Sequence, residues 1–136
     1  MKIGKDNYVD INIIEFGEKN LPSKDDVHLA IKIKAYSFLG QNDIWVEGKN
    51  FCLFCSQLID LEKNRKGEAV LKSISPNELE LKIYIADEVG HFETKGKIGC
   101  YHHLRHWNAV EFNFSLEPYF ITELVKIEWV KKYAKI

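Results

Sequence analysis

Hydrophobic and polar positions alternate with a period of two over several segments of this chain. Val27–Phe38 places apolar side chains at every second position, with His or Lys between several of them, which is the pattern of a strand with one face in water. Glu78–Ala86 and Val110–Leu116 repeat this alternation. Looser or shorter versions of it predict further strands at Val9–Phe16, Ile44–Glu47, Glu68–Ser73 and His91–Ile98.

Turn-forming residues separate these segments. Asn20–Asp26 reads NLPSKDD, which predicts a loop, and shorter clusters predict turns at Gly40–Asp43, Pro76–Asn77 and Asp87–Gly90. Strands that are joined by such short turns pair as antiparallel hairpins. The predicted strands are therefore expected to form a meander.

One stretch of the chain has a helical period instead. In Asn50–Gly67, mostly apolar side chains recur at steps of three and four residues, which predicts an amphipathic helix. Asn50 is expected to cap its first turn, and Gly67 is expected to end it in the left-handed conformation. The recurring side chains, of which only the last is polar, are Phe51, Phe54, Cys55, Leu58, Leu61 and Glu62.

The C-terminal tail fits two patterns. Pro118 suits the first position of a helix, and a helix from there would bury part of Phe120, Ile121, Leu124 and Val125. Residues 119–133 also permit a strand, because apolar and charged residues alternate between positions 125 and 129. We favour the helix.

Together these elements predict an α+β fold. We expect a curved antiparallel β-sheet meander that packs against one central amphipathic helix, with a second helix at the C-terminus if the tail is helical. The helix should cover one face of the sheet and bury its own apolar stripe there. The predicted core contains Leu29, Ile31, Ile33, Leu79, Leu81, Ile83, Phe112 and Phe114 from the strands, and Phe51, Phe54, Leu58 and Leu61 from the helix.

Composition places the chain among ordinary globular proteins. Its 136 residues, 46% hydrophobic and 29% charged, suit one domain spanning residues 1–136. No apolar run approaches the ~20 residues that a membrane helix needs, and the N-terminus does not resemble a signal peptide. Three cysteines, an odd number, argue against a disulfide framework. We therefore expect a cytoplasmic protein without membrane contact, and the net charge of −1 argues against direct binding of nucleic acid.

Cys52 and Cys55 have the CxxC spacing of thiol redox and zinc sites. A helix N-terminus could lower the pKa of such a thiol. However, the glycine–proline context of thioredoxin-like motifs is absent, and Phe54 and Cys55 belong to the apolar stripe. We favour core packing for these cysteines.

Residues 100–106, CYHHLRH, are denser in candidate metal ligands. A zinc site there, in a small metal-binding enzyme, would use Cys100, His102, His103 and His106. We favour a solvent-exposed connection instead, because no carboxylate partner or general base stands out elsewhere. The sequence contains no P-loop, nucleophile elbow, zinc-helix motif or dinucleotide fingerprint, so we expect neither catalysis nor a cofactor.

The same connection is also a candidate protein-binding loop. Tryptophan, tyrosine and arginine are enriched at the centres of protein interfaces, and Trp107 follows the His-rich run directly. A recognition loop would be exposed, whereas a ligand cluster would be buried around a metal ion. The candidate partner-binding residues are Trp45, His102, His103, Arg105, His106 and Trp107.

Several short segments match positions that build a known fold. They are the hairpin ending in Asp43-Ile44-Trp45, Leu58 and Leu61 of the helix, Lys66-Gly67-Glu68-Ala69 after it, and Gly90-His91 at the start of the returning strand. On these residues the run from Leu29 to Ile98 resembles the WapI-type immunity proteins of bacteria. Val110–Leu116 and Pro118 match that family's last strand and following helix. The first 26 residues and Cys100–Trp107 have no counterpart in this resemblance.

The resemblance implies a function without catalysis. Proteins of this family neutralise a partner toxin in contact-dependent competition between bacteria. It therefore implies that this chain binds the C-terminal toxin domain, often a nuclease, of a large exported protein. It assigns no contact residues, because the surfaces of immunity proteins diverge with their toxins.

Overall fold

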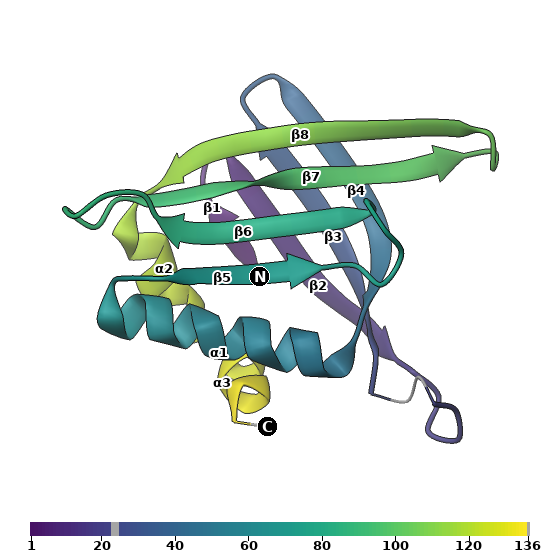
Figure 1. Ribbon diagram of the computed structural model, residues 1–136, viewed down its shortest axis with the longest axis horizontal. Helices are drawn as coiled ribbons and strands as arrows, with labels where there is room; N and C mark the ends of the chain where they lie inside the picture. The colour runs from purple at the N-terminus through teal and green to yellow at the C-terminus, as the bar shows by residue number, and fades with distance from the viewer. Residues whose placement is uncertain (23–24, 136) are drawn as a thin grey trace.

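The computed structural model describes residues 1–22 and 25–135. In this part of the chain, eight strands form two antiparallel four-stranded sheets, accompanied by three helices (Figure 1). The first sheet contains β1 (Lys2–Gly4), β2 (Tyr8–Phe16), β3 (Val27–Ala35) and β4 (Phe38–Val46). The second sheet contains β5 (Glu68–Lys72), β6 (Leu79–Ile85), β7 (Phe92–His102) and β8 (His106–Leu116). The helices are α1 (Gly48–Asn64), α2 (Pro118–Leu124) and α3 (Glu128–Ala134).

The arrangement confirms the α+β fold class and refines it. Strand order equals chain order within each sheet, so both sheets are meanders, as the alternating segments predicted. The strands divide between two sheets that cross each other, with α1 connecting the sheets along the chain (Figure 1). The helix α1 runs along β5 at one edge of the second sheet, with α3 beside it. No helix in the described residues is long and apolar enough to cross a membrane.

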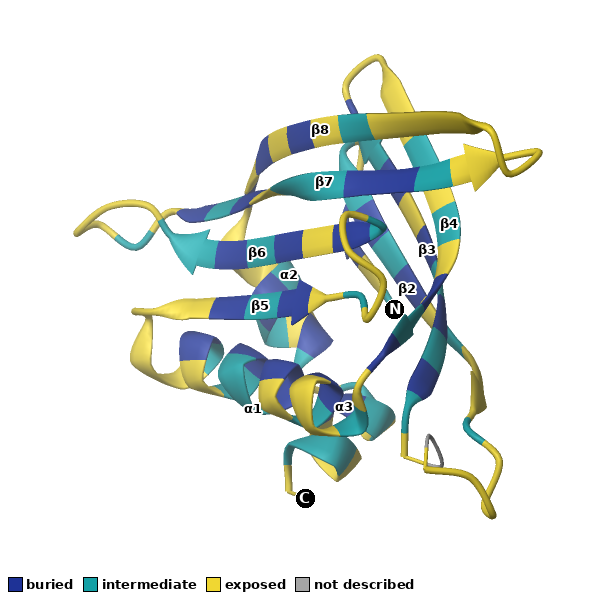
Figure 2. Ribbon diagram, turned by 45° about the vertical axis from the view of Figure 1, so that its right-hand side comes forward, coloured by how far each residue is buried: buried dark blue, intermediate teal, exposed yellow. Residues whose placement is uncertain are grey.

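The hydrophobic core lies between the two sheets and the apolar stripe of α1 (Figure 2). Every side chain predicted for it is buried, with an exposed fraction of 4% or less. The two-residue and 3.6-residue periods therefore identified the inward faces correctly. Cys55 is also fully buried in this core, as the core-packing interpretation predicted, whereas Cys52 is only half-buried and lies outside the core, so the prediction is wrong for Cys52.

The turn predicted at Gly40–Asp43 is wrong, because these residues lie inside β4. The chain turns earlier, at Tyr36, which has a φ of 57°. Gly40 instead marks the place where the two sheets cross. A Cβ atom there would lie 2.5 Å from Ile98 Cγ2 and 3.6 Å from Val110, so glycine permits a close approach that any larger residue would obstruct.

The predicted ends of the central helix shift by two or three residues. The cap is Glu47 rather than Asn50: its carbonyl accepts the first helical hydrogen bond from Phe51 N–H at 2.9 Å. The helix begins at Gly48, whose backbone packs so closely against Asp25 that a Cβ would clash with the Asp25 carbonyl. At the other end, Arg65 adopts the left-handed conformation, φ 55°, before the predicted position Gly67.

The tail is helical from Pro118, with Pro118 in the first turn, so the strand alternative is wrong. The predicted helix is interrupted at residues 125–127, and α3 then packs back onto α1. Val130 is fully buried, and the Trp129 and Tyr133 rings lie 5.3 and 5.4 Å from the Phe51 ring. Burial of these aromatic groups explains why a tail that is apolar on nearly all sides folds as helix.

The remaining predicted loops and turns occur where expected. Residues 20–22 and 25–26 belong to the predicted loop at 20–26, whose residues 23 and 24 lie outside the described residues. At the turn after β6, Asp87 Oδ1 accepts the N–H groups of Val89 and His91. The imidazole of His91 lies 2.6 Å from Asp87 Oδ2, and this bond lowers the pKa of Asp87 and raises the pKa of His91.

One buried hydroxyl group has no hydrogen-bond partner among the described residues, that of Thr94 in β7. A buried polar group left unpaired costs about 1–3 kcal/mol. We therefore expect Thr94→Val to raise the free energy of unfolding by about 1 kcal/mol or more in urea denaturation. Thr94→Ser, which keeps the hydroxyl and loses the methyl group, should lower it. A lower midpoint for the valine variant would mean that the hydroxyl is paired.

Candidate protein-binding site

Residues 100–106, predicted as a solvent-exposed connection, form the end of a long hairpin. In the β7–β8 hairpin, Tyr101 pairs with Trp107 and His102 pairs with His106, without any shift of register. The chain reverses through a tight turn, in which Arg105 N–H donates to the His102 carbonyl at 3.3 Å. The connection is exposed at residues 101–106, as predicted, and long-range pairing along β7 and β8 extends the strands to the tip.

We call residues 101–109 the hairpin tip. Every residue in it is exposed, and the tip projects beyond the rest of the protein (Figure 2). Leu104 is 92% exposed and Tyr101 is 64% exposed. Large apolar groups held out in water at the end of a projecting hairpin are typical of residues that a partner covers.

The turn of the hairpin tip is strained. His103 and Leu104 both have positive φ, 53° and 59°, where an L-residue other than glycine is unfavourable by roughly 1–2 kcal/mol. Asn-Gly is the pair that commonly fills such positions. Strain of this kind is often found at functional sites, where it holds particular side chains in place. Here it presents an imidazole and an isobutyl group at the end of the protein.

The two faces of the hairpin tip differ in chemistry. On one face the Tyr101 and Trp107 rings meet edge to face at 4.9 Å, and the Trp107 ring covers Gly99, where a Cβ would clash with it. The other face carries the paired histidines His102 and His106. Cys100 Sγ lies 3.8 Å from His102 Nε2 on this side.

The structure brings together five of the six candidate partner-binding residues and separates the sixth. His102, His103, Arg105, His106 and Trp107 all lie in the hairpin tip. Trp45 lies in β4, five residues beyond the crossing point at Gly40, and it stacks on His28 at 4.6 Å with nearly parallel rings. Trp45 therefore belongs to a different surface. Sequence reasoning had no means of separating it, because the paths of β4 and β8 depend on sheet packing.

The structure does not gather the four candidate metal ligands into a group. Cys100 and His102 lie within contact distance, whereas His103 lies in the turn. Among the described residues, no three His, Cys, Asp or Glu side chains are placed to hold a metal ion.

The CxxC cysteines lie in the first two turns of α1, and neither is activated. Burial raises the pKa of Cys55 to about 12. Burial and the nearby Asp25 carboxylate also raise the pKa of Cys52. Both thiols are therefore protonated at neutral pH and are poor nucleophiles and metal ligands.

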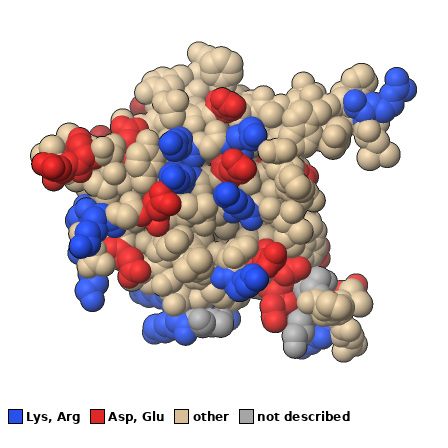
Figure 3. All heavy atoms as spheres, viewed as in Figure 1, with Lys and Arg blue, Asp and Glu red and all other residues tan. Residues whose placement is uncertain are grey.

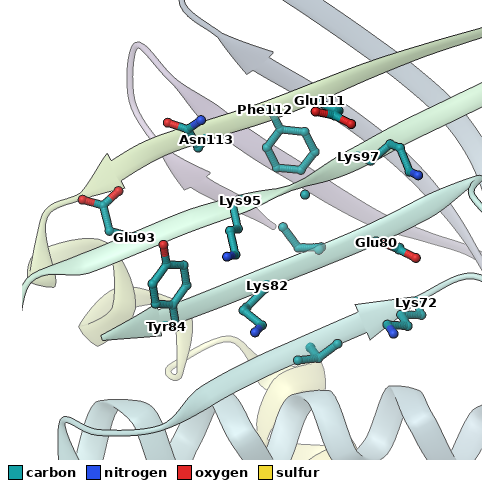
Figure 4. A pocket seen from close by; sticks show the side chains of 13 residues that line it. Lys72, Glu80, Lys82, Tyr84, Glu93, Lys95, Lys97, Glu111, Phe112 and Asn113 are labelled. Carbon is teal, nitrogen blue, oxygen red and sulfur yellow. The ribbon is translucent and has the colours of Figure 1, made fainter. Parts of the chain in front are cut away.

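A shallow depression of about 780 Å³ lies on the outer face of the second sheet (Figure 4). Basic and acidic side chains alternate across it (Figure 3). Several of them have partners on the sheet: Lys82 pairs with Glu68 at 2.8 Å, and Lys95 lies over the Tyr84 ring. Glu80, Glu93 and Glu111 line this face together with four lysines, so it has the mixed charge of a solvated sheet surface.

Comparison with models of protein families matches residues 1–127 to the immunity protein WapI-like family. The chain belongs to this family. Comparisons with curated proteins and with solved structures give no significant match. The family match extends further than the resemblance noted in the sequence. It includes β1, β2 and the Cys100–Trp107 end of the β7–β8 hairpin, for which no counterpart was expected, and it ends just before α3.

Proposed function

We propose that this WapI-like immunity protein binds and neutralises the C-terminal toxin domain of a large exported bacterial protein. It acts in the cytoplasm, without catalysis, and the toxin is a nuclease. Membership of an immunity protein family supports the immunity role. The observation that carries the binding role is the exposed hairpin tip, because it displays interface-type side chains on a strained, preformed turn.

The hairpin tip has the composition of a binding hot spot. Tyr, Trp and Arg dominate such sites, and Tyr101, Trp107 and Arg105 lie within it. The Tyr101–Trp107 contact fixes both rings before a partner arrives. Preorganised side chains lose less conformational entropy on binding. This smaller loss of entropy favours the tight binding by which an immunity protein neutralises a toxin.

The proposal is tested by calorimetric titration with the toxin domain. The probe is the C-terminal domain of the large exported protein encoded directly upstream, prepared as an inactive variant. We expect one-to-one binding with a nanomolar Kd. Absence of binding would contradict the proposal.

Tyr101→Ala should weaken this binding by roughly tenfold or more, as expected for loss of a central aromatic anchor. Tyr119→Ala provides a matched control, because Tyr119 is 62% exposed and packs edge to face on Phe120 in α2, outside the tip. The control should bind like the wild type. Equal affinity of the two variants would mean that the hairpin tip is not the contact surface.

A further inference from the structure

The two sheets have four edges, and three of them are short or covered. The edge strand β1 has three residues. At the β4 edge, the Trp45 carbonyl accepts the Ile74 N–H at 2.8 Å, and β4 lies against β7 and β8 where the sheets cross. The β5 edge lies against α1, where Gln57 Oε1 accepts the Val70 N–H at 3.0 Å. The two hydrogen bonds satisfy the Trp45 carbonyl and the Val70 N–H, which would otherwise be open to another strand.

The fourth edge, formed by β8, is long and open. It has 11 residues, and no further strand pairs with it within the described part of the chain. Proteins usually protect such an edge with lysine, proline or a β-bulge. The β8 strand, HWNAVEFNFSL, contains no lysine or proline, its register with β7 runs unbroken, and Glu111 is its only Asp, Glu, Lys or Arg residue.

The hydrogen bonds of β7 show which backbone groups face the open side. Gly99 N–H donates to the Glu78 carbonyl at 3.1 Å, so it points away from β8. Gly99 and Ala109 are register partners, and they must form a non-hydrogen-bonded pair. The N–H and C=O groups of Ala109 therefore point to the open edge, and those of alternate residues do the same.

The open edge thus presents a regular row of backbone donors and acceptors. The residues whose backbone groups point outward are Trp107, Ala109, Glu111, Asn113 and Ser115. All five are exposed. Figure 4 shows Glu111 and Asn113 on β8, the uppermost strand of the sheet in that view. The row begins inside the hairpin tip, so the tip and the edge form one continuous surface.

The negative charge of Glu111 favours a strand from a different protein over a second copy of β8 as the occupant of this edge. In a pair of identical antiparallel β8 strands with full overlap, Glu111 of one copy would lie opposite Glu111 of the other, and like charges directly opposite are unfavourable. A strand from a different protein can place Lys or Arg opposite Glu111. Nucleases carry such cationic residues to bind phosphate groups.

We propose that β8 accepts an exposed strand of the toxin domain, with a Lys or Arg opposite Glu111, so that the second sheet continues into the partner. This inference rests on the proposed function. Main-chain hydrogen bonds along β8 supply affinity, and alternate side chains supply specificity, as in other cases of strand addition. The hairpin tip provides aromatic anchors at one end of the same contact.

The test compares variants that differ in one backbone N–H. Asn113→Pro removes an edge donor, and proline is tolerated where an edge strand's N–H faces solvent. Asn113→Ala removes the same side chain and keeps the N–H. In titrations with the inactive toxin domain, we expect the proline variant to bind roughly tenfold or more weakly than the alanine variant, because the two differ in the edge N–H and not in the lost Asn113 side chain. Ala109→Pro should repeat the loss at a second edge position.

A second measurement does not depend on variants that could misfold. Hydrogen–deuterium exchange of the wild-type protein should slow at the five edge amides when the toxin domain is added. Unchanged exchange there, or equal affinity of Asn113→Pro and Asn113→Ala, would overturn the strand-addition proposal while toxin binding by the wild type still stands. A wild-type dimer that Asn113→Pro converts to monomer, with toxin binding unaffected, would assign the edge to a second copy and would also overturn it.

Discussion

Replacing Leu58 with alanine is expected to lower the free energy of unfolding by about 2–5 kcal/mol. Leu58 lies on the inward face of α1, and its side chain is fully buried. It belongs to the same contiguous core as the inward residues of both sheets. Truncation would remove a methine and two methyl groups and leave a cavity that rigid strands cannot fill. The measurement is the urea unfolding curve, with attention to the midpoint.

A leucine on the opposite side of the same helix provides the control. Leu53 is 55% exposed, so Leu53→Ala changes helix propensity and residue volume in the same way without opening a cavity. Its cost should stay within about 0.5 kcal/mol, as for most surface substitutions. If Leu53→Ala and Leu58→Ala lowered the free energy of unfolding by similar amounts, the burial of Leu58 in the core would be contradicted.

Gly96→Ala is expected to destabilise the protein by about 1–3 kcal/mol or more. A Cβ at Gly96 would clash with the Glu80 carbonyl oxygen of the neighbouring strand and would lie 2.9 Å from Phe112 Cζ. The first of these atoms belongs to the backbone in the middle of the second sheet, so β6 and β7 would have to separate. Thermal unfolding of the variant should show a clearly lower midpoint.

Gly40 allows the origin of this effect to be checked. At Gly40 the atom in the way belongs to a side chain, Ile98 Cγ2, so Gly40→Ala should cost less in an Ile98→Ala background than in the wild type. Shortening Phe112 should not rescue Gly96→Ala in this way, because the Glu80 carbonyl remains. Full rescue by Phe112→Leu would show that the side chain, and not the backbone, limits space at Gly96.

Local periodicity was sufficient to predict most of the secondary structure. Strands such as Val27–Ala35 and Leu79–Ile85 bury one face, so hydrophobicity alternates along them in the sequence itself. The central helix buries one apolar stripe, and the spacing of Phe51, Phe54 and Leu58 in the sequence predicts it. Its exact ends were less predictable, because Gly48 begins the helix through contact with Asp25, a residue far away in the sequence.

The candidate site was only partly predictable for the same reason. The residues of the hairpin tip were recognisable by type, since aromatic, His and Arg side chains gather there. Their strand conformation was not, because both faces of the tip are exposed and no alternation of hydrophobicity marks it. The pairing of His102 with His106 follows from contacts nearer the core, where β7 and β8 bury Phe112 and Phe114.

The sequence by itself determined the inward faces of the strands, the stripe of the central helix and the family, because each depends on residues close together in the chain. Tertiary structure decided the division into two sheets, the crossing at Gly40, the separation of Trp45 from the hairpin tip and the open edge of β8. Whether an edge is open depends on which distant segments pack beside it. The sequence of β8 alone therefore does not predict that its edge is open.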